Sequence, residues 1–253
     1  MNFIKFLGTA GARFVMIKQL RASGGIWFEI NDTRMIVDPG PGALVRVNKS
    51  RPSLKVSQLD AIFISHKHID HTNDVNVMIE AMTDGGFNKK GIVLCPSEAI
   101  ENPPVIFPYA AALVDRVITL SAGSQYQIKN LKLKIPVRLH HQTETYGFIL
   151  QSDHVPSIGY IPDTEFFPEI ISAYANTEII IINVVFAQPR PKIMHLSLPE
   201  ALDIISGIKP KKAILTHFGL TMLKERIWEK TQYLTEKLSI DIFTASDGMT
   251  VEI

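Results

Sequence analysis

The chain has 253 residues, of which 46% are apolar, and its 26 basic and 25 acidic side chains leave a net charge of +1. This content is sufficient for the core of one domain, residues 1–253, and the balanced charge argues against general attraction to nucleic acid or to a membrane surface. The single cysteine, Cys95, excludes an internal disulfide framework and a zinc site of several thiolates, as is typical of a cytoplasmic protein.

Short apolar segments rich in β-branched residues predict about a dozen strands. Residues 1–8 alternate between apolar and polar side chains and lack the apolar core of an export signal, so we expect them to form the first strand. The longest apolar run, residues 179–186, is far shorter than the ~20 residues of a membrane span, so no membrane partner is expected. The further strands are expected at residues 26–30, 35–37, 61–65, 91–95, 117–120, 131–139, 147–150, 157–161, 178–185, 213–216, 242–244 and 249–253.

Helical patterns are fewer than strand patterns. Apolar side chains recur at helical spacing in residues 75–82, 166–175 and 199–208. Ser197 is placed to open the last of these helices, and a charged amphipathic stretch over residues 220–238 predicts one more. Because strands outnumber helices and helices recur in both halves of the chain, the pattern favours a layered α/β architecture.

The run His66-Lys67-His68-Ile69-Asp70-His71 directly follows the predicted strand 61–65. On an extended segment, side chains two positions apart point the same way, so His66 and His68 can reach one cation. Asp70 and His71 fall where the chain turns toward a helix and can aim in another direction, which suits a second cation beside the first. Because this pattern arises by chance on the order of once in a few thousand such chains, it predicts a metal site.

This run and its position after a strand resemble the signature of the metallo-β-lactamase superfamily, and the resemblance extends over essentially the whole chain. It implies an α/β fold of four layers, the αββα sandwich, whose two halves are related as a pseudo-duplication. It also implies that the metals lie at the edge of the sheets, between the two halves. The number of predicted strands agrees with this fold.

The same resemblance implies further ligands at three later strand ends. The stretch from His141 to Phe148 resembles the ribonuclease Z branch, which selects His141 as a ligand and leaves adjacent His140 as the alternative. Asp163 falls in the segment that supplies a carboxylate bridging both metals, and His217 falls in the segment of the last histidine. The implied site has His66, His68 and His141 on the first metal, Asp70, His71 and His217 on the second, and Asp163 between them.

Asp38 matches the first motif of the superfamily, where the acid holds a ligand histidine by a hydrogen bond. Histidine and carboxylate ligands without cysteine suit zinc, with manganese or iron as alternatives. Two such ions a few ångströms apart lower the pKa of a shared water toward ~7 and clamp the attacking and leaving oxygens of a displacement. The expected cofactors are therefore two divalent ions, and the expected chemistry is hydrolysis.

Departures from other branches of the superfamily narrow the reaction. The commonest lactamases place a cysteine on the second metal, whereas Cys95 lies outside every ligand motif. Thiolesterases of the glyoxalase type and many lactonases carry Pro-Gly-His-Thr where this chain has Leu-His-His-Gln-Thr at residues 139–143. His195, just ahead of a predicted helix, resembles the ribonuclease Z histidine that donates a proton to the leaving oxygen. The resemblance therefore favours the branch of ribonuclease Z and the cyclic phosphodiesterases, with Asp70 and His195 as catalytic residues.

The spacing of the later motifs bears on the substrate. Only 21 residues lie between His141 and Asp163, which leaves no room for the basic arm by which ribonuclease Z grips tRNA. We therefore expect a small molecule, a phosphodiester or nucleotide, as substrate rather than a nucleic acid. The alternatives are a lactone or thioester hydrolase and a non-catalytic, cofactor-handling protein, and assembly into a homo-oligomer is left open.

A glycine-rich loop over residues 8–25 follows the first predicted strand. It carries three cations, Arg13, Lys18 and Arg21. These side chains either hold an anionic group of the substrate or stand on an ordinary solvated turn, and the sequence favours neither reading.

Overall fold

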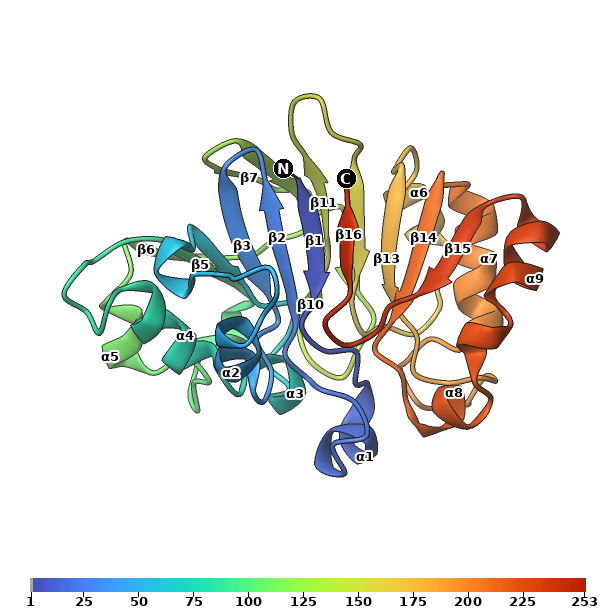
Figure 1. Ribbon diagram of the computed structural model, residues 1–253, viewed down its shortest axis with the longest axis horizontal. Helices are drawn as coiled ribbons and strands as arrows, with labels where there is room; N and C mark the ends of the chain where they lie inside the picture. Colours follow the sequence, from blue (N-terminus) through green and yellow to red (C-terminus); the bar gives the residue numbers. More distant parts are fainter. Residues whose placement is uncertain (1) are drawn as a thin grey trace.

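Two seven-stranded sheets lie face to face, and helices cover the outer side of each (Figure 1). The computed structural model describes residues 2–253. In the first sheet the strand order is β16 (Thr250–Glu252), β1 (Phe3–Phe6), β2 (Ile26–Ile30), β3 (Thr33–Val37), β4 (Ala61–Phe63), β5 (Ile92–Cys95) and β6 (Arg116–Thr119). In the second it is β15 (Asp241–Thr244), β14 (Lys212–Thr216), β13 (Ile179–Asn183), β12 (Ile158–Ile161), β11 (Phe148–Gln151), β8 (Leu131–Lys134) and β7 (Gln125–Ile128). A separate pair is formed by β9 (Arg138–Leu139) and β10 (Thr145–Tyr146).

Each sheet is antiparallel on one side and parallel on the other. Strands β16, β1, β2 and β3 pair antiparallel, and β3, β4, β5 and β6 pair parallel. The second sheet repeats this plan, with β7, β8, β11 and β12 antiparallel and β12, β13, β14 and β15 parallel. Parallel neighbours need a crossover connection, and these crossovers bring the helices onto the outer faces.

The helices form the two outer layers (Figure 1). The first sheet is covered by α2 (Ala43–Asn48), α4 (Val75–Met82) and α5 (Pro108–Ala111), with α3 (Ile69–Thr72) at its lower end. The second sheet is covered by α6 (Glu169–Ala173), α7 (Leu198–Ile208), α8 (Leu220–Lys224) and α9 (Thr231–Leu238). One further helix, α1 (Ala12–Ile17), projects from the lower end of the sandwich. This arrangement confirms the predicted four-layer αββα sandwich.

Alternating side chains of the strands serve two cores. In β1, Ile4 and Phe6 belong to the core between the sheets, whereas Phe3 belongs to the core beneath the helices. Between the sheets, the ring of Phe148 packs edge-on against those of Phe28 and Phe63, with centroids 5.9 and 4.9 Å apart. Burial of these apolar side chains, reinforced by edge-to-face aromatic contact, holds the two sheets together.

The strands lie where the sequence predicts them, with two kinds of difference. The predicted segment 131–139 is two strands, β8 and β9, and the sequence did not indicate β7 or β10. Strand β7 is an edge strand with the sequence Gln-Tyr-Gln-Ile, and only its last residue is buried. A strand with so little buried surface carries too few apolar residues to be recognised from its pattern.

The predicted helices differ more. The predicted helix over residues 220–238 is wrong as a single element, because the chain takes a left-handed turn at Arg226 (φ 50°) and a 3-10 turn, Ile227–Glu229, before α9 begins. The loop over residues 8–25 contains α1, and α2, α3 and α5 were not predicted. Helices of four to six residues present too few turns for an apolar period to show.

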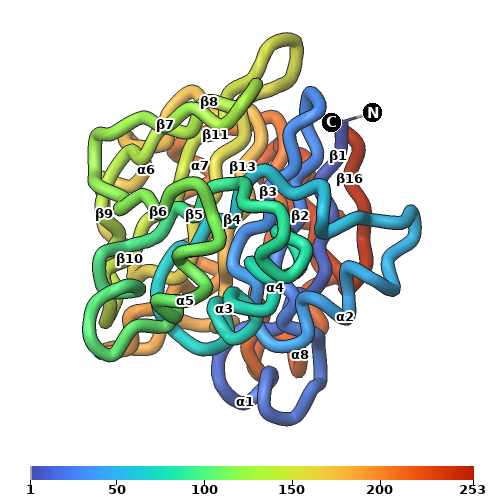
Figure 2. Tube along the Cα trace, turned by 90° about the vertical axis from the view of Figure 1, so that its left-hand side faces the viewer, coloured from blue at the N-terminus to red at the C-terminus, as the bar shows by residue number. Residues whose placement is uncertain are grey.

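Helices α4 and α7 agree with the sequence. Helix α4 has the predicted bounds, and α7 begins at Leu198 after Ser197, whose side chain forms a capping box with Glu200. The ends of the described chain lie side by side (Figure 2), because β1 and β16 pair and Ile253 N donates to Asn2 O at 2.9 Å. None of the described helices has the length and apolar character needed to cross a lipid bilayer.

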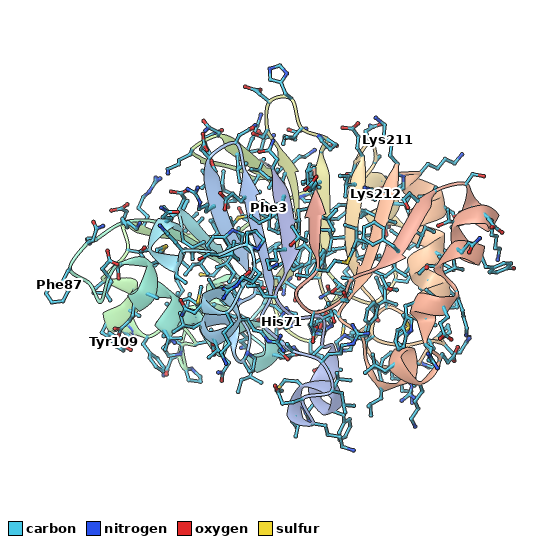
Figure 3. The ribbon with its side chains drawn as sticks, viewed as in Figure 1. Phe3, His71, Phe87, Tyr109, Lys211 and Lys212 are labelled. Atoms are coloured by element: carbon cyan, nitrogen blue, oxygen red, sulfur yellow. The ribbon has the colours of Figure 1, made fainter. Side chains whose placement is uncertain are left out.

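We expect Phe148→Ala to lower the free energy of unfolding by about 3–5 kcal/mol, because its fully buried ring joins the two sheets and its loss leaves a cavity. Phe87→Ala is the control, since Phe87 is 95% exposed and its ring stands at the outer end of a loop (Figure 3). Its effect should stay within about 0.5 kcal/mol. Urea unfolding followed by circular dichroism measures both, and similar small losses in the two variants would contradict this account of the core.

Candidate metal centre

The histidine run lies where the chain leaves β4 and enters α3. His68 is extended (φ −62°, ψ 147°) and directly precedes α3, whereas His66 follows β4 by three residues. Asp70 and His71 follow inside the short helix and therefore point in other directions. His66 and His71 are buried, while His68 and Asp70 are partly exposed.

Three histidines form a first group. His68 Nδ1 lies 3.0 Å from His66 Nε2 and 3.1 Å from His141 Nε2. His66 comes from the end of β4 and His141 from the loop between β9 and β10. Because all three are imidazole nitrogens within 4.8 Å of one another, the group has the donor set of a zinc-type site.

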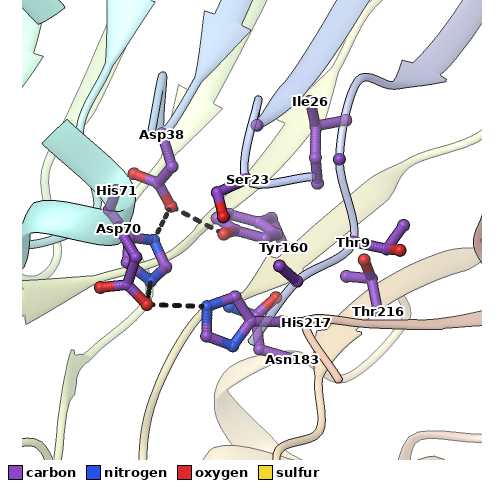
Figure 4. Close-up of a pocket in the computed structure, with 13 residues that line it drawn as sticks. Thr9, Ser23, Ile26, Asp38, Asp70, His71, Tyr160, Asn183, Thr216 and His217 are labelled. Atoms are coloured by element: carbon purple, nitrogen blue, oxygen red, sulfur yellow. Dashed lines mark hydrogen bonds and ion pairs between the residues drawn. The ribbon is translucent and has the colours of Figure 1, made fainter. Parts of the chain in front are cut away.

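Asp70, His71 and His217 form a second group (Figure 4). Asp70 Oδ2 lies 3.9 Å from His71 Nε2 and 3.6 Å from His217 Nε2. His217 follows β14 in a left-handed conformation (φ 61°), which turns its side chain toward the other sheet's residues. Such backbone is uncommon for residues other than glycine and is concentrated at functional sites.

Asp163, at the end of β12, stands between the two groups. Its Oδ2 lies 3.9 Å from His66 Nε2 and 3.6 Å from His71 Nε2, and its Oδ1 lies 3.2 Å from His217 Nδ1. Asn183 Nδ2 donates to Oδ1 at 2.9 Å and fixes the carboxylate. Asp163 is 3% exposed, so this charge is buried among histidines of both groups.

Asp38 is the hydrogen-bonding centre behind the site (Figure 4). Its Oδ1 accepts from Ser65 N at 2.7 Å. Its Oδ2 accepts from Ser65 Oγ at 2.7 Å, from the Tyr160 hydroxyl at 2.8 Å and from His71 Nδ1 at 3.0 Å. Because His71 Nδ1 donates a hydrogen bond to this carboxylate, Nε2 is the ring nitrogen directed at the second group.

The tautomers of two further histidines follow from their partners. Ser65 Oγ has one hydrogen atom, which it donates in its hydrogen bond to Asp38. It therefore acts as the acceptor of the hydrogen bond from His66 Nδ1, at 2.9 Å. His141 Nδ1 donates to Met194 O at 2.8 Å. Both rings therefore present the unprotonated Nε2 to the first group, which is the form that binds a metal.

The pKa values of the first group's histidines and of Asp163 are also shifted in the directions that favour binding of a cation. Burial lowers the pKa of His66 well below its usual range, with His71 adding to the effect, and burial also lowers the pKa of His68 and of His141. Burial alone would raise the pKa of Asp163, but the nearby histidines, His217 first, hold it well below its ordinary value. Neutral imidazoles are the state in which the first group receives a divalent cation. In the second group, burial would lower the pKa of His71, but Asp38 and Asp70 raise it well above its ordinary value, so a cation that binds there would displace a proton.

Divalent metal ions fit these residues, as unpaired atoms show. His71 Nε2 and both ring nitrogens of His217 are buried and have no hydrogen-bond partner among residues 2–253, although carboxylate oxygens lie nearby. A buried polar atom left in this state costs about 1–3 kcal/mol, and coordination of a cation would remove that cost. Histidine and carboxylate donors without sulfur suit zinc, manganese or iron.

His195 lies at the edge of the cluster. Its Nδ1 is 3.4 Å from Asp163 Oδ2, and its ring centroid is 4.9 Å from that of His141. The ligand atoms of His141, Asp163 and His195 lie within 4.8 Å of one another. Burial lowers the pKa of His195. The geometry therefore allows His195 either to donate a proton in a reaction or to bind a cation. Substitution of His195 distinguishes the two roles.

The alternative ligand and the three cations considered for substrate binding lie apart from the site. His140 stacks on Phe167, with ring centroids 4.0 Å apart, and its half-exposed side chain faces Glu165. Arg13 and Lys18 are exposed on and beside α1, and Arg21 donates to Thr9 Oγ1 at 3.0 Å. None of these four side chains lines the cavity at the second group.

Sequence reasoning missed Ser65, Tyr160 and Asn183, which orient the residues described above. Asn183 has a visible signal, since it is the one polar residue in the apolar run 179–186. It also missed Gly40, where a Cβ atom would lie 1.9 Å from Asp70 O and 2.3 Å from Ser23 O. Only glycine lets these segments approach so closely.

Comparisons with known proteins bear on the family and the fold. A model described as "Beta-lactamase superfamily domain" matches residues 33–218. An uncharacterised protein of Methanocaldococcus jannaschii is 33% identical, over 99% of this chain and 94% of that protein. Ribonuclease Z of Borrelia garinii is 21% identical, over 98% of this chain and 96% of that enzyme. The crystal structure of the metallo-β-lactamase fold protein YhfI from Bacillus subtilis superposes with a TM-score of 0.81 at 19% identity, covering 100% of this chain and 99% of that one.

We expect Asp38→Asn to lower affinity for divalent metal about 10–100-fold, because an amide nitrogen in place of a carboxylate oxygen faces N–H and O–H donors. Asparagine keeps the size of aspartate and tolerates the left-handed backbone at this position (φ 52°). Competition with a chromophoric chelator measures the affinity, with the exposed Asp153→Asn as control. Unchanged metal affinity in a folded Asp38→Asn protein would show that Asp38 does not support metal binding.

Proposed function

The chain belongs to the metallo-β-lactamase superfamily, near ribonuclease Z, and we propose that it is a dinuclear metal-dependent phosphodiesterase acting on a small phosphodiester or nucleotide. The observation that carries the proposal is the position of Asp163, whose carboxylate lies within 3.9 Å of histidines from both groups. A buried carboxylate in this position can bridge two cations and be neutralised by them.

Seven side chains would hold the two ions. His66, His68 and His141 would bind one, Asp70, His71 and His217 the other, and Asp163 both. Zinc is the ion we expect first, and manganese and iron accept the same donors. When bound, two divalent ions supply an acidified water and draw charge away from the phosphoryl oxygens.

The chain's own groups position the reacting atoms. Burial would raise the pKa of Asp70, but His71 and His217 hold it well below its ordinary value, so the group is a carboxylate. Its Oδ2 lies toward those histidines, which leaves Oδ1 to accept a hydrogen bond from the attacking water. Asn183 and Asp38 hold the orientations of Asp163 and His71 and thereby the geometry of the site.

His195 would serve the leaving group. An alkoxide that leaves phosphorus needs a proton, and histidine is the side chain that most often supplies one near neutral pH. Because Nδ1 of His195 faces Asp163 Oδ2 at 3.4 Å, Nε2 is the nitrogen that would deliver the proton, and it carries one when the ring is in its imidazolium form. The position of His195 beside the site supports a reaction whose product is an alcohol.

The segment between His141 and Asp163 supports a small substrate. The described chain uses it for β10, β11 and β12, which belong to the fold itself, so the basic arm expected of ribonuclease Z is not inserted here. The relative from Borrelia garinii is named for a nuclease, which supports phosphodiester chemistry at this site. We therefore propose that the protein cleaves phosphodiester bonds and does not bind tRNA through such an arm.

We expect Asp163→Ala and His68→Ala each to abolish hydrolysis of bis(p-nitrophenyl) phosphate and to reduce bound metal, because each removes a proposed ligand. Elemental analysis gives metal per chain, and release of p-nitrophenolate gives turnover. His140→Ala is the matched control, since it removes a histidine beside His141 that faces away from the cluster. Full activity in either ligand variant, or turnover of lactones alone by the wild type, would contradict the proposal.

We expect His195→Ala to slow cleavage of a phosphodiester with an alkyl leaving group about 10²–10⁴-fold. Cleavage of bis(p-nitrophenyl) phosphate should change far less, because p-nitrophenolate leaves without a proton. Bound metal should stay at the wild-type level. Loss of metal together with equal losses on both substrates would instead assign His195 as a ligand, which its distance from Asp163 also permits.

A further inference from the structure

A second cavity, of about 250 Å³, opens beside the candidate metal centre. It lies between the start of α1, the segment after β13 and the start of α8, which meet at one end of the molecule (Figure 1). Phe14, Phe186 and Leu220 contribute apolar surface, and Arg190 and Lys224 contribute positive charge. No acidic side chain is among the residues that line it.

The cavity adjoins His195, which is proposed to serve the leaving group, and His217, which is a proposed metal ligand. The ring of Phe186 lies edge-on to that of His195, with centroids 6.1 Å apart. Gly11 lines the cavity and backs directly onto His217, since a Cβ atom at Gly11 would lie 1.9 Å from His217 O and 2.8 Å from His217 Nδ1. Through Phe186 and Gly11, the cavity therefore adjoins both His195 and His217.

The wall of the cavity combines an aromatic face with cations. The guanidinium of Arg190 lies over the ring of Phe186, 4.8 Å from its centroid. Neither Arg190 nor Lys224 has an ion-pair partner within the described chain, and both are exposed. Phe14, which also lines the cavity, is 62% exposed. Aromatic rings accept flat ring systems by stacking, and unpaired cations favour an anionic group on the same ligand.

We propose that this cavity binds the leaving part of the substrate and that this part is a nucleotide, with a base against Phe186 and a phosphate near Arg190 and Lys224. The inference rests on the proposed function. In the reaction, an oxygen of water forms the new bond to phosphorus and that water loses a proton to solvent, while the bond from phosphorus to the leaving oxygen breaks. The proton of His195 passes to that oxygen, and the nucleotide departs as an alcohol. Phe186, Arg190 and Lys224 are substrate-binding residues in this account and take no part in the bond changes.

Calorimetric titration of the metal-loaded protein tests the inference with three probes: adenosine 5′-monophosphate, ribose 5-phosphate and adenosine. The first and second share a phosphate and differ in the ring, so any binding of phosphate to the metals cancels in their ratio. We expect adenosine 5′-monophosphate to bind at least about tenfold more tightly than ribose 5-phosphate, because stacking of a base contributes on that scale. It should also bind more tightly than adenosine.

Variants locate the binding. Phe186→Leu keeps an apolar side chain without the aromatic face and should reduce the ratio between the two phosphates, whereas Arg190→Ala and Lys224→Ala should each weaken adenosine 5′-monophosphate several-fold. Phe87→Leu and Lys237→Ala change an exposed aromatic and an exposed cation elsewhere and should leave all three affinities at the wild-type level. Equal binding of the two phosphates, or no effect of the cavity variants, would overturn the inference.

The outcome separates this inference from the proposed function. Hydrolysis of bis(p-nitrophenyl) phosphate with no preference for the nucleotide would overturn the cavity's role and leave the phosphodiesterase intact. Absence of hydrolysis with the expected nucleotide binding would overturn the phosphodiesterase and support the nucleotide as the ligand class of the cavity. Because binding is measured without turnover, the titration tests the role of the cavity and the hydrolysis assay tests the phosphodiesterase activity.

Discussion

The rest of the site depends on the hydrogen bonds that the carboxylate of Asp38 accepts. It accepts hydrogen bonds from Ser65 and His71 on the first sheet's side and from Tyr160 on the second sheet. A buried charge is tolerated only when such donors surround it, and here the donors come from both halves of the sandwich. Correct packing of the two sheets is therefore required before Asp38 can fix the tautomers of His71 and, through Ser65, of His66. The site and the core between the sheets are thus parts of one structure.

The second constraint is that chain segments leaving several strands converge at one edge. Asp38 follows β3, the histidine run follows β4, Asp163 follows β12 and His217 follows β14. Because β3 and β4 are parallel, as are β12, β13 and β14, their carboxyl ends lie at a common edge within each sheet. The left-handed backbone at Asp38 and His217 then turns each side chain inward. The regular sheets supply rigidity, and a few irregular residues supply direction.

Much of the fold could be predicted because strands that are buried on both faces carry long apolar runs. The segments at β5, β12 and β13 are examples, and each is fully buried. Elements with little buried surface escaped prediction for the same physical reason. Only Val15 of α1 is buried, and β7 lies at a sheet edge, so neither sequence shows a clear period. A break such as Arg226 is also invisible locally, since nothing in an arginine's sequence context marks a left-handed conformation.

The sequence by itself determined the kinds of donors available, the spacing of the run from His66 to His71, and the absence of a cysteine from the ligand motifs. These are local properties, set by neighbouring residues and by the period of the strand. Only the tertiary structure decided that His141 and not His140 faces the cluster, that Asn183 holds Asp163, and that a cavity with Phe186 and Arg190 adjoins His195. Such relations join residues far apart in the chain, as between Asp38 and Tyr160, and side-chain direction at a strand end depends on what packs against it.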